Sequence, residues 1–197
     1  MGESEQGLDE TGTALVDAAL AVYLERGWQG ASLAEIAGRA GLTTGAIYSR
    51  FSGKNELFAA VLERELGRMN AEVERRLGEV ASEVERLAVL RQWFRERRGR
   101  AGVRIFYDLW HQAAEYPRLR KALLAIYERM TESVASGLER YLGPRLHAVG
   151  LEARTLAVVS TALMEGLLLR QFLTQSEEPV DLVFDLLERW LAPLLRG

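Results

Sequence analysis

Apolar residues recur along most of the chain at the three- and four-residue spacing that places them on one face of an α-helix. The first run begins at Leu15 and stops at Gly27, a residue typical of helix ends. No stretch alternates apolar and polar residues as a half-buried strand does. The pattern predicts an all-α fold of about nine helices, over residues 15–26, 32–41, 43–50, 54–77, 82–98, 103–116, 117–143, 152–173 and 179–195.

The first three predicted helices are short and are followed by a much longer one. Ser32 and Glu35 have the spacing of a capping box at the start of the second helix, and Thr43 is placed to cap the third. Further along the chain, Gly143 and Pro144 are expected to end the seventh helix. We therefore expect an N-terminal helix-turn-helix head, residues 1–55, joined to a larger C-terminal helical body, residues 56–197.

Composition narrows the class of protein. The chain is 48% apolar and 27% charged and lacks cysteine, which excludes disulfides and thiolate metal sites. Its acidic start lacks the apolar run of a signal peptide, and the apolar stretch over 155–164 is shorter than the roughly 20 residues of a membrane span. A cytoplasmic protein without a membrane partner is expected.

The net charge of −3 argues against a wholly basic nucleic-acid binder. Its distribution is uneven, because no acid occurs between Glu35 and Glu56, whereas Arg39, Arg50 and Lys54 lie within that window. This window coincides with the two short helices and the turn between them. The local charge is therefore compatible with DNA binding by the head.

Two short helices joined by a tight turn that contains glycine are typical of a helix-turn-helix unit. Gly41 suits a positive φ after the first helix, and Leu42, Ile47 and Phe51 have the spacing to pack the pair against helix 15–26. The outward surface is then small and hydrogen-bonding, as a helix in a DNA major groove requires. Its residues are Thr43, Thr44, Gly45, Tyr48 and Ser49.

Residues 32–57, together with Arg26-Gly27-Trp28, resemble the head of the TetR (tetracycline-repressor-like) family almost position by position. The resemblance is specific over about residues 8–62. It implies that Ser32 and Thr43 touch phosphates, and that Lys54 grips a phosphate beside the N-terminus of the long helix. It also implies that Thr44, Gly45, Tyr48 and Ser49 face the groove. Arg50 falls where the family often has histidine, and its target, phosphate or base, stays open.

The same resemblance implies a homodimer that binds a palindromic operator, most often as a repressor. The last two predicted helices have more apolar surface than one body needs, which favours a second subunit covering them. A buried hairpin in a monomer is the alternative. The expected interface residues are Leu163, Leu167, Val183, Leu187, Trp190 and Leu194.

A small-molecule pocket in the body is implied mainly by the family. Aromatic residues gather on three consecutive predicted helices, as in many ligand pockets, although such stripes are more often simple core. If they line a pocket, the effector is hydrophobic or aromatic. The candidate lining residues are Trp93, Phe106, Tyr107, Trp110, His111, Tyr127 and Met130.

Other functions have less support. The sequence has no Gly-rich phosphate loop, no nucleophile elbow and no histidine pair with metal-ligand spacing, so neither catalysis nor a cofactor or metal is expected. The alternative to a DNA-binding regulator is a helical protein-interaction module without sequence-specific DNA binding. The arginine cluster between Arg95 and Arg104 is either an anion site or, more simply, a solvated helix end.

Overall fold

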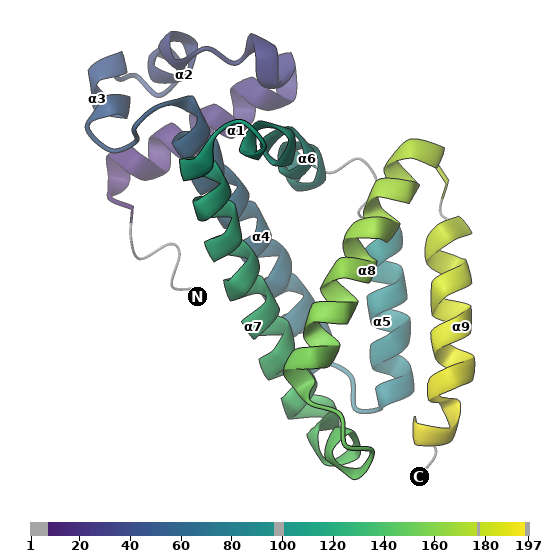
Figure 1. Cartoon of the computed structure of the whole chain (residues 1–197). Coiled ribbons are helices and arrows are strands. Elements are labelled where there is room, and N and C mark those ends of the chain that lie inside the picture. Colours follow the sequence, from purple (N-terminus) through teal and green to yellow (C-terminus); the bar gives the residue numbers. More distant parts are fainter. Residues whose placement is uncertain (1–7, 97–100, 177, 196–197) are drawn as a thin grey trace. The chain divides into compact units, whose positions relative to one another are not determined.

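The computed structural model describes the backbone of residues 8–96, 101–176 and 178–195, and their side chains except at positions 83–84, 101–103, 178 and 190–195. These described residues form nine α-helices and no strand (Figure 1), which confirms the predicted all-α fold. In chain order the helices are α1 (Glu10–Gly30), α2 (Leu33–Arg39), α3 (Thr44–Tyr48), α4 (Lys54–Gly78), α5 (Glu83–Arg95), α6 (Ala101–Ala113), α7 (Pro117–Ala148), α8 (Ala153–Thr174) and α9 (Glu178–Leu195).

The helices form two compact units. The head unit comprises Met1–Met69 and Arg100–Tyr127, and the body unit comprises Asn70–Gly99 and Glu128–Gly197. The long helices α4 and α7 each begin in the head unit and end in the body unit. The head unit therefore contains α6 as well as α1–α3, whereas the sequence places a functional boundary after residue 55. That functional boundary stays a prediction.

A single apolar core holds the head unit together. Its side chains recur every three or four positions along α1 and α4, and burial of each large one contributes on the order of 1.5–3 kcal/mol. Ile47 and Phe51 belong to this core and Leu42 packs against it, as predicted, so the opposite face of α3 points outward. The most completely buried members include Leu15, Val22, Ile36, Ile47, Leu57, Phe58, Leu62, Ile105 and Leu109.

A Schellman motif fixes the turn between α2 and α3. Gly41 has a φ of +69°, a conformation that strains residues with a side chain. Its amide donates to the Gly38 carbonyl at 3.1 Å, and the amide of Leu42 donates to the Ala37 carbonyl at 2.9 Å. The glycine predicted for this turn is thus confirmed by its geometry.

The seventh helix is longer than predicted. Gly143 and Pro144 were expected to end it, but α7 continues through both to Ala148. Proline inside a helix costs about 3 kcal/mol, and here the burial of Leu146 and a second Schellman motif at Gly150 oppose that cost. In that motif the Leu151 amide donates to the Leu146 carbonyl at 2.9 Å. The glycine that ends the helix is therefore Gly150.

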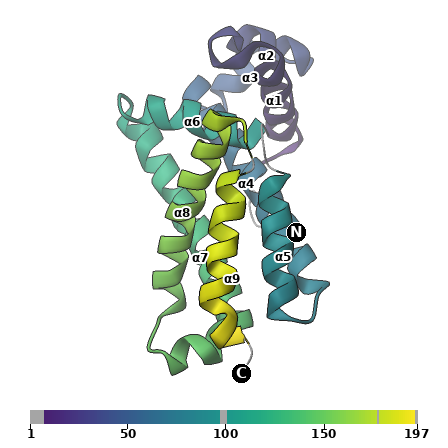
Figure 2. The ribbon, with the colours of Figure 1, turned by 90° about the vertical axis from the view of Figure 1, so that its right-hand side faces the viewer.

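In the body unit, α9 lies beside both α5 and α8 (Figure 2). The buried rings of Phe94 on α5 and Phe184 on α9 pack with centroids 5.7 Å apart. Next to them, Arg91 and Arg95 of α5 form ion pairs with Asp181 of α9, at 3.1 and 2.5 Å. Apolar and ionic contacts together fasten α9 to α5.

Candidate DNA interface

The short helices α2 and α3 begin at polar N-cap residues. Ser32 Oγ accepts the Glu35 amide at 3.2 Å, while the Glu35 carboxylate pairs with Arg26 at 2.8 Å. Only the Ser32 half of the predicted capping box is therefore present, because Glu35 is held by an arginine of α1. Thr43 has the extended backbone of an N-cap residue, but its hydroxyl makes no capping hydrogen bond. The exposed Thr43 hydroxyl is thus left to face solvent or a ligand.

The outward face of α3 is polar and accessible. Tyr48 is 61% exposed, and Gly45 and Ser49 are exposed beside it, with Thr44 partly so. Ser49 Oγ donates to the Ala46 carbonyl at 2.9 Å, which fixes its side chain along the helix end. The structure therefore brings the predicted groove-facing residues together on one small surface.

Gly45 adds no side chain to this surface, although the fold does not require a glycine at this position. A Cβ at this position would meet only Thr43 Oγ1, at 3.6 Å, which is ordinary van der Waals contact. Its φ is not positive either, so neither packing nor backbone conformation requires a glycine. The absence of a side chain instead lets an external surface approach the start of α3.

Arg50 is held within the protein. Its guanidinium forms a bidentate ion pair with Asp9, the N-cap residue of α1, and its Nε to Oδ1 distance is 2.9 Å. It also donates to Ser49 Oγ at 3.0 Å. The hydrogen bonds from Arg50 lower the pKa of Asp9 to about 2. The positive charge of Arg50, which was expected near the DNA backbone, is therefore largely paired with the Asp9 carboxylate.

Lys54 is bound to the end of α1. Its ammonium donates to the Trp28 carbonyl and lies 4.7 Å from the centroid of the Trp28 ring. That carbonyl follows Gly27, where α1 leaves helical geometry near the predicted helix end. Partial burial lowers the pKa of Lys54, and the nearby Asp108 carboxylate acts in the opposite direction. In this arrangement Lys54 connects the end of α1 to the start of α4.

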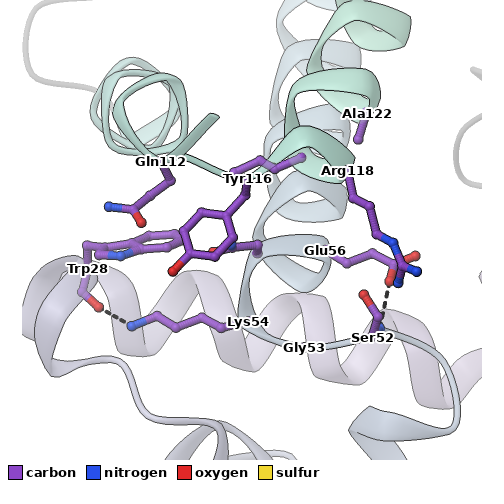
Figure 3. A pocket seen from close by; sticks show the side chains of 11 residues that line it. Trp28, Ser52, Gly53, Lys54, Glu56, Gln112, Tyr116, Arg118 and Ala122 are labelled. Carbon is purple, nitrogen blue, oxygen red and sulfur yellow. Dashed lines mark hydrogen bonds between the residues drawn. The ribbon is translucent and has the colours of Figure 1, made fainter. Parts of the chain in front are cut away.

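A cleft of about 720 Å³ opens beside Lys54 (Figure 3). Its walls come from the end of α1, the start of α4, the end of α6 and the start of α7, all within the head unit. The lining residues are Trp28, Ser52, Gly53, Lys54, Asn55, Glu56, Gln112, Tyr116, Arg118, Leu119 and Ala122.

A partly buried hydrogen bond joins α1 to α6. The hydroxyl of Tyr23, which is fully buried, donates to Asp108 Oδ2 at 2.5 Å. Burial, followed by this hydrogen bond, raises the pKa of Tyr23 well above its usual range. Sequence reasoning missed both Asp9 and Asp108. An N-cap signal before α1 marks Asp9, but no local signal marks a contact that spans 85 positions.

Two family models match the chain. One, described as bacterial regulatory proteins of the tetR family, matches residues 15–61. The other, described as the C-terminal part of a BetI-type transcriptional repressor, matches residues 83–196, more than half of the chain. The chain belongs to the TetR family. It is therefore a DNA-binding transcriptional regulator, and the interaction module without DNA binding is set aside.

Individual TetR-family relatives extend over most of the chain. The transcriptional activator FasR of Mycolicibacterium smegmatis is 30% identical over 74% of this chain and 68% of its own. The regulator AcrR of Shigella flexneri is 28% identical over 99% and 96% of the two chains. Among solved structures, the multidrug binding protein EbrR complexed with proflavin has a TM-score of 0.65 at 22% identity, covering 91% of this chain and 99% of its own. At that identity the structural likeness shows the fold alone.

The aromatic residues expected to line an effector pocket of this TetR-family chain divide between the two units. In the head unit, Phe106 packs against Tyr107 and Tyr127, with ring centroids 5.3 and 5.8 Å away. Trp110 is 65% exposed and His111 is also exposed. In the body unit, Trp93 is buried against Phe94 and Met130 is partly buried. The structure thus gathers three of the seven residues through ring contacts within one unit.

The residues expected at a TetR-family dimer interface differ in exposure. Leu163 on α8 is 43% exposed, whereas Leu167 is buried, and Val183 and Leu187 on α9 are partly buried. Leu167 is therefore a core residue of the body unit. The side chains of Trp190 and Leu194 lie outside the described residues.

α8 is longer and more exposed than the apolar stretch 155–164 suggests. Glu165 and Arg170 interrupt that stretch without ending the helix, and by length and composition the 22 residues of α8 suffice to cross a membrane. Only 22% of its most apolar segment is buried within the chain. One helix of this length and composition is weak evidence for a membrane span, because core helices of soluble proteins share both properties.

The arginine cluster is described only at its ends. Arg95 pairs with Asp181, and the exposed Arg104 lies 5.8 Å from the centroid of the Tyr23 ring. The side chains of Arg97, Arg98 and Arg100 lie outside the described residues.

Proposed function

We propose that this TetR-family chain is a cytoplasmic, homodimeric repressor that binds a palindromic operator through α3 and is released by a hydrophobic or aromatic small molecule. The observation that carries the DNA-binding part is the outward face of α3. This face combines an exposed Tyr48, polar neighbours and a glycine that the fold does not require. A helix that enters a major groove needs such a surface at its N-terminal end.

The residues of the head take separate roles in this proposal. Thr44, Gly45 and Tyr48 face the base edges, because they occupy the exposed side of α3. Ser32 and Thr43 lie at helix N-termini, where hydroxyl groups and backbone amides bind phosphate. These contacts fix the position of the head, and the contacts from α3 select the sequence.

Arg50 and Lys54 are engaged in the free protein, which refines their roles. Arg50 orients Ser49 and holds α1 through Asp9, so its main contribution is to support α3. Lys54 binds a phosphate only after its ammonium leaves the Trp28 carbonyl. DNA binding therefore includes a rearrangement of one lysine side chain.

A second copy of the chain is the proposed partner of α8 and α9. Large apolar side chains remain exposed on both helices, and a two-fold axis covers the same patch on each copy. Two heads related in this way read successive major grooves roughly 34–36 Å apart. The exposed side chains include Val158, Val159, Leu163, Leu169, Phe172, Leu173, Leu182 and Leu186.

Repression is supported by the family model that matches the body, and release by a ligand is supported by one solved structure and by composition. The family model that matches the body is described as a transcriptional repressor, and EbrR was solved with proflavin, a planar aromatic compound. In this chain the candidate lining residues are mainly aromatic, as in many sites for apolar ligands. An effector releases DNA only if it binds the DNA-free arrangement more tightly.

The test is selection of DNA fragments from the source genome with the purified chain, followed by binding of the recovered site to variants. We expect a palindromic site. Tyr48→Ala should lower the preference for that site over random DNA, whereas Lys54→Ala should weaken binding to all DNA and lower the salt slope by about one per head. Leu124→Ala, which truncates another exposed residue of the head unit, is the matched control. Failure to enrich any sequence at low salt contradicts the proposal.

A further inference from the structure

The cleft in the head unit is separate from the residues expected to line the effector pocket. None of its lining residues belongs to that set, and its volume of about 720 Å³ is typical of sites for small ligands. Four helices contribute to it, so its shape depends on how α6 and α7 pack against the DNA-binding helices. A molecule bound there therefore contacts both parts of the head unit.

Two cationic side chains line the cleft. The ammonium of Lys54 is partly buried and lies over the Trp28 ring, while Arg118 at the start of α7 contributes an exposed guanidinium. The single carboxylate of the lining, Glu56, already accepts a hydrogen bond from the Ser52 amide at 2.6 Å. The charge of the lining is therefore positive, and its one acid is engaged.

Aromatic surface lies next to these cations. The Trp28 ring stacks near Phe58, with centroids 5.0 Å apart, which fixes its orientation. Figure 3 shows Tyr116 beside the Trp28 ring and Gln112 above it, and 47% of Tyr116 is exposed. A flat ring placed here has one aromatic wall held in place by the core and one accessible from solvent.

We propose that this cleft binds a small aromatic carboxylate. Its ring lies against Trp28 and Tyr116, and its carboxylate pairs with Lys54. Figure 3 shows Arg118 at the other end of the cleft, beside Glu56, where it adds positive charge to the lining. The Lys54 ammonium exchanges the neutral Trp28 carbonyl for a charged acceptor, which gives a stronger hydrogen bond.

The proposal also makes Lys54 a point of competition. A lysine that holds the ligand carboxylate does not at the same time bind a DNA phosphate. Binding of the ligand to the cleft does not require that Lys54 also binds DNA. The effect of the ligand on DNA binding does rest on the phosphate contact proposed above for Lys54. The two claims are therefore tested by different measurements.

Binding is tested by calorimetry of the full chain with 2-naphthoate and with its neutral analogue 2-naphthamide. We expect 2-naphthoate to bind at least tenfold more tightly. Lys54→Gln should remove most of that preference, and Tyr116→Ala should weaken binding of both compounds. Arg120→Gln, at an exposed arginine of α7 that does not line the cleft, is the matched control and should bind like the native chain.

Equal affinity for the two compounds overturns the proposal, as does binding that is unchanged in both Lys54→Gln and Tyr116→Ala. Loss of binding in Met130→Ala but not in these two variants places the ligand in the body unit and also overturns it. Melting temperatures of all variants show that each is folded.

The effect on DNA is measured with the selected operator and 2-naphthoate. We expect weaker DNA binding and a salt slope lower by about one per head, as one phosphate contact is lost. If no operator is found but 2-naphthoate binds as described, the proposed regulatory function fails and the cleft site stands. If DNA binding is sequence-specific and 2-naphthoate leaves it unchanged, the competition at Lys54 is wrong.

Discussion

Gly45 is the residue where the needs of the fold and of DNA binding separate most clearly. Gly45 is the second residue of α3, and glycine within a helix is less favourable than alanine by up to about 1 kcal/mol. The surroundings of Gly45 offer no compensation, because the space for a methyl group is free. A glycine at position 45 is explained if DNA has to approach the backbone of α3 closely.

Gly45→Ala should therefore stabilise the protein and impair its function. We expect the free energy of unfolding to rise by about 0.5–1 kcal/mol, since alanine reduces the conformational freedom of the unfolded chain. Affinity for the operator should fall at least tenfold, because the methyl group stands between α3 and the base edges. Urea unfolding and gel shift measure the two effects.

Gly137→Ala provides the control, because Gly137 lies in α7 of the body unit with free space around its Cα. It should raise stability without changing DNA affinity. Unchanged operator affinity in Gly45→Ala would show that α3 does not approach DNA closely.

The Asp9–Arg50 pair makes a pH-dependent contribution to stability. Arg50 lowers the pKa of Asp9 to about 2 in the folded chain, against about 4 for an unperturbed aspartate. A lowered pKa stabilises the fold above the unfolded value, and this stabilisation is lost as the pH falls toward the folded value. Asp9→Asn removes the charge and keeps a good N-cap residue.

We expect the melting temperature of Asp9→Asn to be lower than that of the native chain by a constant amount between pH 7 and about pH 5. The gap should narrow below about pH 4, because Asp9 becomes protonated in the unfolded chain while it stays ionised in the folded chain down to about pH 2. A gap that stays constant down to pH 3 would mean that the ion pair does not contribute. Calorimetric scans at several pH values give the answer.

At the scale of helices, local signals predicted most of what the structure shows. The cap at Ser32 and the glycine turn at Gly41 depend on neighbours within a few residues, so spacing alone reveals them. The helix end predicted at Pro144 was wrong, because the burial of Leu146 that keeps α7 helical is a tertiary effect. Long helices that bury side chains override local helix-breaking signals.

The site was predictable only in part, for a related reason. Residue type and spacing identify which face of α3 is outward, because that depends on one helix and its core. The partners of Arg50 and Lys54 come from α1, more than 20 positions away in sequence. No pattern in one sequence reports such contacts, and the exposed charges predicted for both residues are engaged in the free protein.

The hydrogen bond between Tyr23 and Asp108 ties two helices together. Tyr23→Phe keeps the buried ring and leaves a partly buried carboxylate without this donor. A hydrogen bond to a charged group contributes about 1.5–3 kcal/mol, so we expect the free energy of unfolding to fall by about that amount. Equilibrium urea unfolding measures it.

Asp108→Asn is the companion variant, since an amide oxygen still accepts from Tyr23. It should lose less stability than Tyr23→Phe. If Tyr23→Phe is as stable as the native chain, the bond between α1 and α6 does not hold the head unit together.

At the scale of the whole molecule, the proposed dimer depends on the exposed apolar face of α8 and α9. Leu163→Asp places a charge at the centre of that face without touching the core, since 43% of Leu163 is exposed. We expect the variant to sediment as a 22.1 kDa monomer at micromolar concentration and the native chain to sediment at twice that mass. Sedimentation velocity distinguishes the two.

Val149→Asp is the control, because Val149 is 56% exposed at the end of α7 and lies on neither α8 nor α9. It should remain dimeric. A native chain that sediments as a monomer throughout this concentration range rules out the proposed interface.

The discontinuous head unit has a consequence for engineering new regulators. Chimeras are commonly designed by exchanging an N-terminal reading module between homologous proteins. An exchange of residues 1–55 here separates Tyr23 from Asp108 and removes α1 from Ile105 and Leu109, which complete its core. Transplanted specificity is better achieved by resurfacing α3 in place, or by moving residues 100–127 together with the N-terminal segment.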